Sequence, residues 1–331
     1  MTLPLSVLDL SPVGAGITPS QAIRDSISLA RIAEELGYTR YWFAEHHNMA
    51  SIATSAPEVL IASAAAVTTK IKLGAGGMMV PNHAPLHVIE VFRTLEALAP
   101  GRIDLGLGRA PGTDPVASAA LRRTDTEVNA QLAELFAFER GGFPVSHPFA
   151  KIEPMPTDVE AGTMWMLGST LAGASIAAQL GVPYAFAGHF AMSQAVAAIA
   201  LYKRRFEASK RHATPYAMLA VTAVCADTDE QAIRLAAPLR VAIVKSRTGR
   251  RSPIGSVEEA LAYRFSPEEE AIAAEFFEGA VIGSPATVAA GLTKLALESQ
   301  ADELMLSSLL PDLGARTRSL QLIASAMKGA A

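Results

Sequence analysis

Short apolar runs alternate with longer amphipathic runs along the whole chain, and this alternation most constrains the fold. Parallel strands need a crossover connection, usually a helix, so a repeated strand–helix pattern predicts a parallel α/β protein. Eight such units can be counted, which is the number in a (β/α)₈ TIM barrel. The predicted strands are residues 5–10, 40–44, 71–75, 103–107, 164–167, 184–187, 217–225 and 303–306.

Local signals place several helices between these strands. Thr18 before Pro19 predicts an N-cap with proline at the first helical position, and Gly37 predicts the end of the same helix. A helix is also expected after each later strand, among them residues 125–139, 192–210 and 314–327, and one that begins near Asp229. Residues 76–83 are expected to form a loop, and residues 141–162 to be irregular.

We expect one domain over residues 1–331. An open, doubly wound sheet is the alternative, and the barrel is favoured because ligand-like loops follow several successive strands instead of one crevice. Residues 241–282 are longer than a normal connection. They predict an insertion between the seventh and eighth strands, and a long insertion at the active-site end of a barrel is often a lid.

Composition narrows the classes of partner. Half of the residues are hydrophobic and the net charge is −4, which favours a large core and predicts binding to neither nucleic acid nor an anionic membrane. The one basic cluster, Lys245 to Arg251, is short and is more typical of a solvated loop. With no signal-peptide pattern at the start and no apolar run of membrane-spanning length, the expected location is the cytoplasm.

Cysteine and histidine usage argues against a metal cluster. The single cysteine, Cys225, lies in an apolar run and is expected to act as a small buried hydrophobe. His46 and His47 are adjacent, and adjacent side chains diverge along a strand, so the pair is a poor chelate. We therefore expect no metal site.

Active sites of barrels lie at the carboxyl ends of the strands, and the second strand is followed there by Glu45, His46 and His47. A histidine in this place can transfer a proton near neutral pH. It can equally serve only to hydrogen-bond a loop carbonyl, and position alone does not decide between the two.

The third predicted strand ends in Gly76 and Gly77, where the backbone can approach a flat ligand because no Cβ intervenes. The alternative is a plain turn. Met78, which follows, either packs under a ring system or fills core.

Arg109 follows the fourth strand, and a fixed arginine there is a good phosphate clamp. Gly168, Ser169 and Thr170 precede a predicted helix and offer hydroxyl and backbone N–H groups at its positive end, which suits a phosphate or an ordinary N-cap. Gly106-Leu107-Gly108-Arg109 only superficially matches a dinucleotide fingerprint, because no helix opens at the required place.

The sequence resembles the bacterial luciferase-like flavin monooxygenases. The resemblance is carried by residues 41–48, 79–86, 95–114, 168–170 and 181–187, in that order along the chain.

This resemblance implies a TIM barrel that binds FMN, often as reduced flavin supplied by a separate reductase. It implies that His46 is catalytic with Glu45 as a supporting polar group, and that a non-proline cis peptide joins Gly76 and Gly77 against the flavin. The remaining carried-over residues would hold the flavin phosphate: Arg109, Ser169 and Thr170.

Two positions depart from the luciferase pattern. Gly108 stands where the luciferases carry a cysteine, so a non-luminescent relative is expected. Ser169 stands where they carry an acidic residue, which bears on the phosphate contacts.

Three functions follow as hypotheses. The first is an FMN-dependent monooxygenase that uses O₂ on a small organic substrate such as an aldehyde, alkane or ketone. The second is a deazaflavin-dependent hydride-transfer enzyme, and the third a non-catalytic flavin-binding accessory protein. Apolar helix faces lead us to expect a homodimer: Ile61, Ala65, Val88, Val91 and Leu95.

Overall fold

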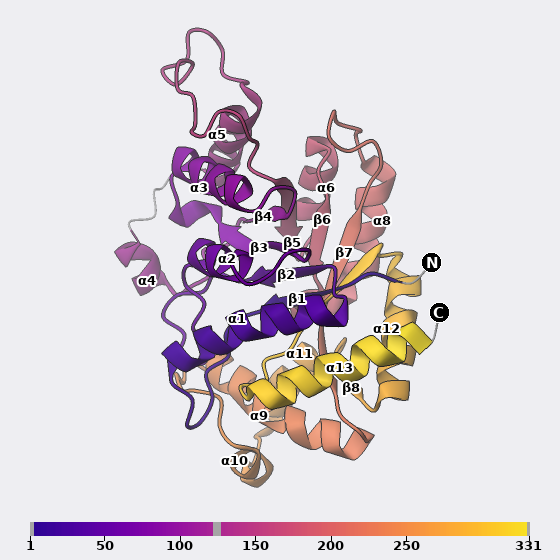
Figure 1. The fold of residues 1–331 in the computed structure, drawn as a ribbon. Coiled ribbons are helices and arrows are strands. Elements are labelled where there is room, and N and C mark those ends of the chain that lie inside the picture. Colours follow the sequence, from indigo (N-terminus) through magenta and orange to yellow (C-terminus); the bar gives the residue numbers. More distant parts are fainter. Residues whose placement is uncertain (1–2, 122–126, 330–331) are drawn as a thin grey trace.

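Eight parallel strands close into a barrel in the computed structural model, which describes residues 3–121 and 127–329 (Figure 1). Neighbouring strands pair in chain order from the first to the seventh, and β9 closes the ring between β7 and β1. The predicted (β/α)₈ barrel is thus confirmed. The strands are β1 Leu5–Asp9, β2 Arg40–Phe43, β3 Lys72–Met79, β4 Ile103–Gly108, β5 Thr163–Gly168, β6 Tyr184–Ala187, β7 Ala217–Cys225, β8 Val281–Gly283 and β9 Glu303–Ser307.

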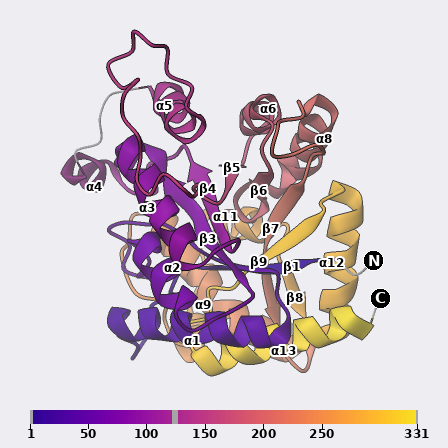
Figure 2. The same cartoon turned by 45° about the horizontal axis from the view of Figure 1, so that its top comes forward.

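Helices surround this barrel, and both chain termini lie near each other at one end of it (Figures 1 and 2). The first helix follows its sequence signals, since Thr18 caps it and Gly37 ends it in the left-handed conformation. No helix of the described ranges is long and apolar enough to cross a membrane. The helices are α1 Pro19–Leu36, α2 Pro57–Ala65, α3 Pro85–Leu98, α4 Pro115–Ala120, α5 Val128–Arg140, α6 Leu171–Leu180, α7 Gly188–Ala191, α8 Ala195–Arg205, α9 Asp229–Arg247, α10 Val257–Ala262, α11 Pro267–Phe277, α12 Pro285–Ser299 and α13 Leu313–Gly329.

Three elements differ from the sequence expectations. Strand β3 continues to Met79 instead of ending in a loop, because residues 76–79 still pair with β4 across an irregularity. The helix expected over 192–210 starts with a 3₁₀ turn over Met192–Gln194, continues as α8 and ends at Arg205, while the short helix α7 precedes it. The helix expected from Asp125 begins at Val128 in the described part of the chain, and residue 125 itself lies outside that part.

The predicted insertion begins later than expected. Residues 241–247 are the last turns of α9, and the connection to α12 then holds α10, α11 and the short strand β8, which pairs with the end of β7. The chain between α9 and α10 is anchored, because Ile254 exchanges backbone hydrogen bonds with the β1–α1 loop at Val13 and Ala15. This part of the insertion is therefore held against the barrel end.

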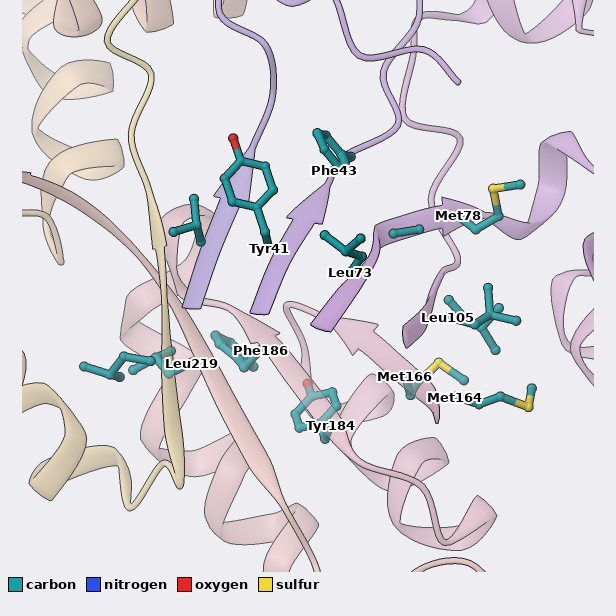
Figure 3. Close-up of a cluster of buried hydrophobic side chains, with 14 of the residues drawn as sticks. Tyr41, Phe43, Leu73, Met78, Leu105, Met164, Met166, Tyr184, Phe186 and Leu219 are labelled. Atoms are coloured by element: carbon teal, nitrogen blue, oxygen red, sulfur yellow. The ribbon is translucent and has the colours of Figure 1, made fainter. Parts of the chain in front are cut away.

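Most of the core lies between the strands and the surrounding helices. Figure 3 shows buried side chains of this layer, among them Tyr41, Phe43, Leu73 and Tyr184. Cys225 belongs to the same layer and is buried as a free thiol, as the sequence predicted.

A separate apolar cluster fills the barrel interior. It contains the edge-to-face pair Trp42 and Trp165, whose ring centroids are 5.2 Å apart. Because side chains alternate along a strand, strands such as β1, β2 and β5 contribute to both layers.

A buried ionic cluster lies below the tryptophans. The guanidinium of Arg40 donates to Glu303 at 2.9 and 3.0 Å and to Asp104 at 2.8 Å. Asp104 also accepts hydrogen bonds from the indole nitrogens of Trp42 and Trp165 at 3.0 and 3.2 Å. One cation thus balances two carboxylates inside the barrel. Burying these charges costs free energy, and the hydrogen bonds to both carboxylates offset that cost.

We expect Arg40→Met to destabilise the protein by about 3–5 kcal/mol, because it leaves two buried carboxylates without their cation. The free energy of unfolding in urea measures this. Arg31→Met is the matched control, since its pair with Glu35 is largely exposed and its loss should change stability by no more than about 0.5 kcal/mol. Equal effects of the two substitutions would contradict the assigned importance of the buried cluster.

Candidate functional site

A cavity of about 240 Å³ opens at the carboxyl ends of the barrel strands, and we call it the barrel cavity. Most of the residues singled out in the sequence lie on its wall, although they come from four different strand ends. The lining includes His46, Gly76, Gly77, Arg109, Gly168, Ser169, Thr170, Leu8, Leu10, Trp42, Leu167, Ala185, His189, Phe190, Ala220 and Met305.

Gly76 and Gly77 form one wall of the barrel cavity and are joined by a non-proline cis peptide, as the family resemblance implied. A Cβ on Gly76 would lie 2.7 Å from Leu8 Cδ1 and 3.0 Å from Trp42 Cε3. A Cβ on Gly77 would lie 2.9 Å from both the Gly106 carbonyl oxygen and a methyl group of Leu167. The close packing leaves room only for glycine at both positions. Gly76 and Gly77 therefore present backbone without side chains to the cavity.

Met78 does not line the barrel cavity. It is 1% exposed and packs in the layer between strands and helices, where Figure 3 shows it with Leu73 and Phe43. Of the two readings left open from the sequence, the structure places Met78 in the core-filling position.

Glu45 lies beneath the cavity wall and is completely buried. Its carboxylate accepts hydrogen bonds from the backbone N–H of Met79 at 2.7 Å and from the side-chain amide of Asn82 at 3.0 Å. The Nε2 atoms of His83 and His47 lie 3.0 and 2.9 Å from it. One carboxylate therefore joins the end of β2 to the end of β3 and the turn that follows.

The charges of this cluster reinforce one another. Burial alone would raise the pKa of Glu45, but the contacts from His83, Asn82 and the Met79 N–H outweigh burial and lower that pKa. Burial would likewise lower the pKa of His83, and its contact with Glu45 instead raises it. Both shifts favour the ion pair over its neutral form.

His46 differs from its neighbours because its pKa is lowered. Burial is the main cause, and it outweighs the opposing effects of the Gly112 carbonyl and of Glu45. The Nδ1 atom lies 3.1 Å from that carbonyl oxygen, which can only accept, so Nδ1 carries the proton. The neutral ring then keeps its lone pair at Nε2.

The carbonyl that fixes this tautomer belongs to Gly112, whose backbone passes close to the end of β2. Its φ is +63°, and a Cβ there would lie 2.9 Å from the Glu45 carbonyl oxygen.

Arg109 lies at another part of the barrel cavity, beside the start of α6. A Cβ on Gly173 in the first turn of that helix would lie 3.4 Å from a terminal nitrogen of Arg109. The Nε atom of Arg109 is buried and has no hydrogen-bond partner among the described residues. Thr170 caps α6 by accepting from the Gly173 N–H at 3.4 Å. The arginine and the helix N-terminus together form a positive corner.

Sequence reasoning missed several residues of this site. His83 and Asn82 contact Glu45, and His189 and Phe190 line the cavity from α7. Burial, with His46 nearby, lowers the pKa of His189 to about 4, so this ring is neutral. A usable signal was present for His189, because it follows the end of a predicted strand as His46 does.

The sequence matches a family model described as luciferase-like monooxygenase over residues 3–301. A luciferase-like monooxygenase of Escherichia coli (strain K12) is 40% identical over 325 residues, which cover 97% of this chain and 96% of the relative.

The chain belongs to the luciferase-like monooxygenase family.

The N-acetyl-S-alkylcysteine monooxygenase of Bacillus subtilis (strain 168) is 34% identical over 98% of both chains. The crystal structure of apo-MsnO8 superposes with a TM-score of 0.88 at 34% identity and covers 99% of this chain and 98% of its own. More distant structures share the fold alone. They include the FMN complex of the oxygenating constituent of 3,6-diketocamphane monooxygenase from Pseudomonas putida, with a TM-score of 0.73 at 19% identity, 98% coverage of this chain and 97% of its own. An F420-dependent secondary alcohol dehydrogenase has a TM-score of 0.66 at 13% identity and covers 99% of both chains.

We expect Glu45→Gln to lower the pKa of His83 below the ordinary histidine value, because burial remains and the carboxylate that opposes it is gone. An NMR titration of the histidine ring measures this pKa. Glu58→Gln is the matched control, since Glu58 also raises the pKa of His83 but less than Glu45 does. A larger shift in the control than in Glu45→Gln would refute the role given to Glu45.

Proposed function

We propose that this luciferase-like protein is an FMN-dependent monooxygenase. The observation that carries the proposal is the buried, unpartnered Nε of Arg109 beside the N-terminus of α6, in the same cavity as His46. A buried guanidinium nitrogen without a partner calls for an anion, and a phosphate satisfies both the arginine and the helix end.

The rest of the barrel cavity fits the flat part of a flavin. Gly76 and Gly77 offer a surface of backbone without side chains, and Trp42 and Leu8 lie directly behind it. The apolar lining suits a ring system, with the polar groups confined to the ends of the site. Arg109, Ser169 and Thr170 would hold the phosphate, and Gly168 would lie against it.

The chemistry of oxygen transfer would be supplied by reduced flavin and O₂, because no amino-acid side chain performs it. The protein's own residues position the cofactor, exclude water and manage protons. His46 is suited to the last task, since its neutral ring has its proton fixed on Nδ1 and a basic lone pair on Nε2. Glu45 acts as the supporting group that orders the loops around His46.

The wider proposal concerns partners. The substrate is a small organic molecule such as an aldehyde, alkane or ketone, and reduced FMN comes from a separate flavin reductase. Support comes from a relative that is named as a monooxygenase of N-acetyl-S-alkylcysteine, and from a structure of the same fold that contains FMN. We also propose a homodimer. Of the apolar helix positions that led to this expectation, three are buried in the core of the chain itself, namely Ile61, Val88 and Leu95, and only Ala65 and Val91 remain partly exposed for a partner.

A deazaflavin-dependent hydride-transfer enzyme is the second candidate, because an F420-dependent alcohol dehydrogenase has the same fold. Titration of the protein with FMN and with a deazaflavin separates this candidate from the FMN-dependent monooxygenase.

A third possibility is a flavin-binding accessory protein. Such a protein would bind FMN but would consume no O₂ in response to any substrate.

We expect Arg109→Met to weaken FMN binding by about tenfold or more, because the phosphate loses a charge-assisted hydrogen bond. Flavin fluorescence during titration measures the affinity. Riboflavin, which lacks the phosphate, is the matched ligand, and its affinity should not change. Equal losses for both flavins would place the effect of Arg109 elsewhere than on the phosphate.

We expect His46→Ala to reduce the oxygenation of substrate by reduced FMN and O₂ by about a hundredfold, the usual contribution of a positioned acid or base. Product formation across a panel of aldehydes and ketones measures this. His147→Ala is the control, because this histidine lies in the irregular segment after α5 and lines no part of the barrel cavity. Unchanged oxygenation in His46→Ala would sink the assigned role.

A further inference from the structure

A second cavity adjoins the barrel cavity, and His46 lines both. We call it the rim cavity; its volume is about 370 Å³. Its wall comes from the β2–α2 loop, the β4–α4 loop, the end of α9 and the segment that follows α9. The lining residues are His46, His47, Asn48, Met49, Ala50, Ser51, Gly112, Thr113, Asp114, Ala242, Ser246, Gly249, Arg250, Arg251 and Ser252.

We propose that the rim cavity binds a carboxylate on the organic substrate, with the rest of the substrate extending past His46 into the barrel cavity. The proposal rests on the oxygenase function proposed above and specifies its substrate class. It assigns a role to the basic cluster that sequence reasoning treated as a solvated loop.

The rim cavity is rich in hydrogen-bond donors. Its charged lining residues are Arg250, Arg251 and Asp114, two cations against one anion among the described residues. Three serine hydroxyls add further donors. Of these, the hydroxyl of Ser252 is buried and has no partner within the described ranges. An acceptor-rich, negatively charged group is the ligand that such a wall satisfies best.

Arg251 is the residue best placed to contact the carboxylate. One of its terminal nitrogens lies 2.8 Å from Asp114, while its other donors make no hydrogen bond in the described structure. Asp114 also accepts from Asn48 at 2.8 Å and caps α4. The aspartate thus holds the guanidinium group in place through one terminal nitrogen. The other N–H donors of Arg251 stay available for a ligand.

Arg250 has a different role, because its guanidinium group is already bonded to Glu269 and Tyr263 of the insertion. Its charge is balanced by the Glu269 carboxylate, and its donors are mostly occupied. The wall is fixed in position, since the hydrogen bonds of Ile254 hold the segment just after Ser252 against the β1–α1 loop.

The cofactor phosphate is a poor candidate for this cavity. Arg109 and the start of α6 line the barrel cavity and not the rim cavity, so the proposed phosphate site lies elsewhere. A molecule that occupies the rim cavity and reaches the barrel cavity must pass His46, the proposed proton-transfer residue. That path is the one expected of a substrate.

The test is a calorimetric titration of the purified protein with octanoate and with octanamide, which share the alkyl chain and have an anionic carboxylate or a neutral amide at the polar end. Octanoate should bind about tenfold more tightly. Arg251→Gln should remove this preference, whereas Arg247→Gln should keep it, because Arg247 belongs to the same basic cluster but does not line the cavity. Asp114→Asn, which preserves a capping oxygen, should keep or increase the preference.

Several outcomes would overturn the proposal. Equal affinity for acid and amide, or a preference that survives in a folded Arg251→Gln protein, would remove the carboxylate contact. The alkyl chain of octanoate should add affinity by entering the barrel cavity, so octanoate should bind more tightly than acetate or inorganic phosphate. Equal affinity for these anions would indicate a site that binds any anion and not a substrate. Unfolding curves of the variants separate loss of binding from loss of fold.

A turnover assay completes the test. With 8-oxooctanoate and its methyl ester as substrates, Arg251→Gln should raise KM about tenfold for the acid only and leave kcat unchanged. A rise in KM for both substrates would contradict a carboxylate contact. The titrations need neither flavin nor turnover, so their failure leaves the proposed oxygenase standing, and failure of FMN binding leaves their result intact.

Discussion

The arrangement of the site depends on one buried carboxylate. Glu45 has no contact with solvent and gathers hydrogen bonds from the end of β3, from the turn after it and from a histidine beside it. A buried charge costs free energy unless hydrogen-bond donors surround it. The end of β3 and the turn after it supply those donors, so both are held close to the Glu45 carboxylate. His46 follows Glu45 directly, and its position is set by the same constraint. The polar network under the cavity therefore determines the geometry of the cavity wall.

The barrel interior is divided along its axis into two chemical environments. At one end, Arg40 balances Asp104 and Glu303 in a hydrogen-bonded cluster. Toward the other end, the indole rings of Trp42 and Trp165 cover that cluster, and Trp42 also lines the barrel cavity. The indole nitrogens face the carboxylate of Asp104 while the rings face the apolar side, so each tryptophan satisfies both environments.

Much of the fold was predictable from the sequence because its signals are local. Strands β6 and β7 begin and end where the apolar runs do, and α1 begins at its capping threonine. What could not be predicted depends on contacts distant in sequence. The extension of β3 to Met79 requires its pairing with β4, and the break between α7 and α8 follows no proline in that segment.

The site shows the same division. The place of Glu45 and His46 after a strand made them candidates, and the family resemblance gave them their expected roles. The attraction of His83 to Glu45 depends on tertiary structure, and so does the meeting of Arg251 with Asp114.

The position of the tryptophans has a practical consequence. The chain contains only two, and both lie in the barrel interior, with Trp42 on the cavity wall. Indole emission from this protein therefore arises entirely at the centre of the barrel and carries no background from the surface. A molecule entering the cavity changes the surroundings of one emitter directly and of the other through ring contact. The protein thus contains its own optical probe, and occupancy of the cavity can be followed without a label.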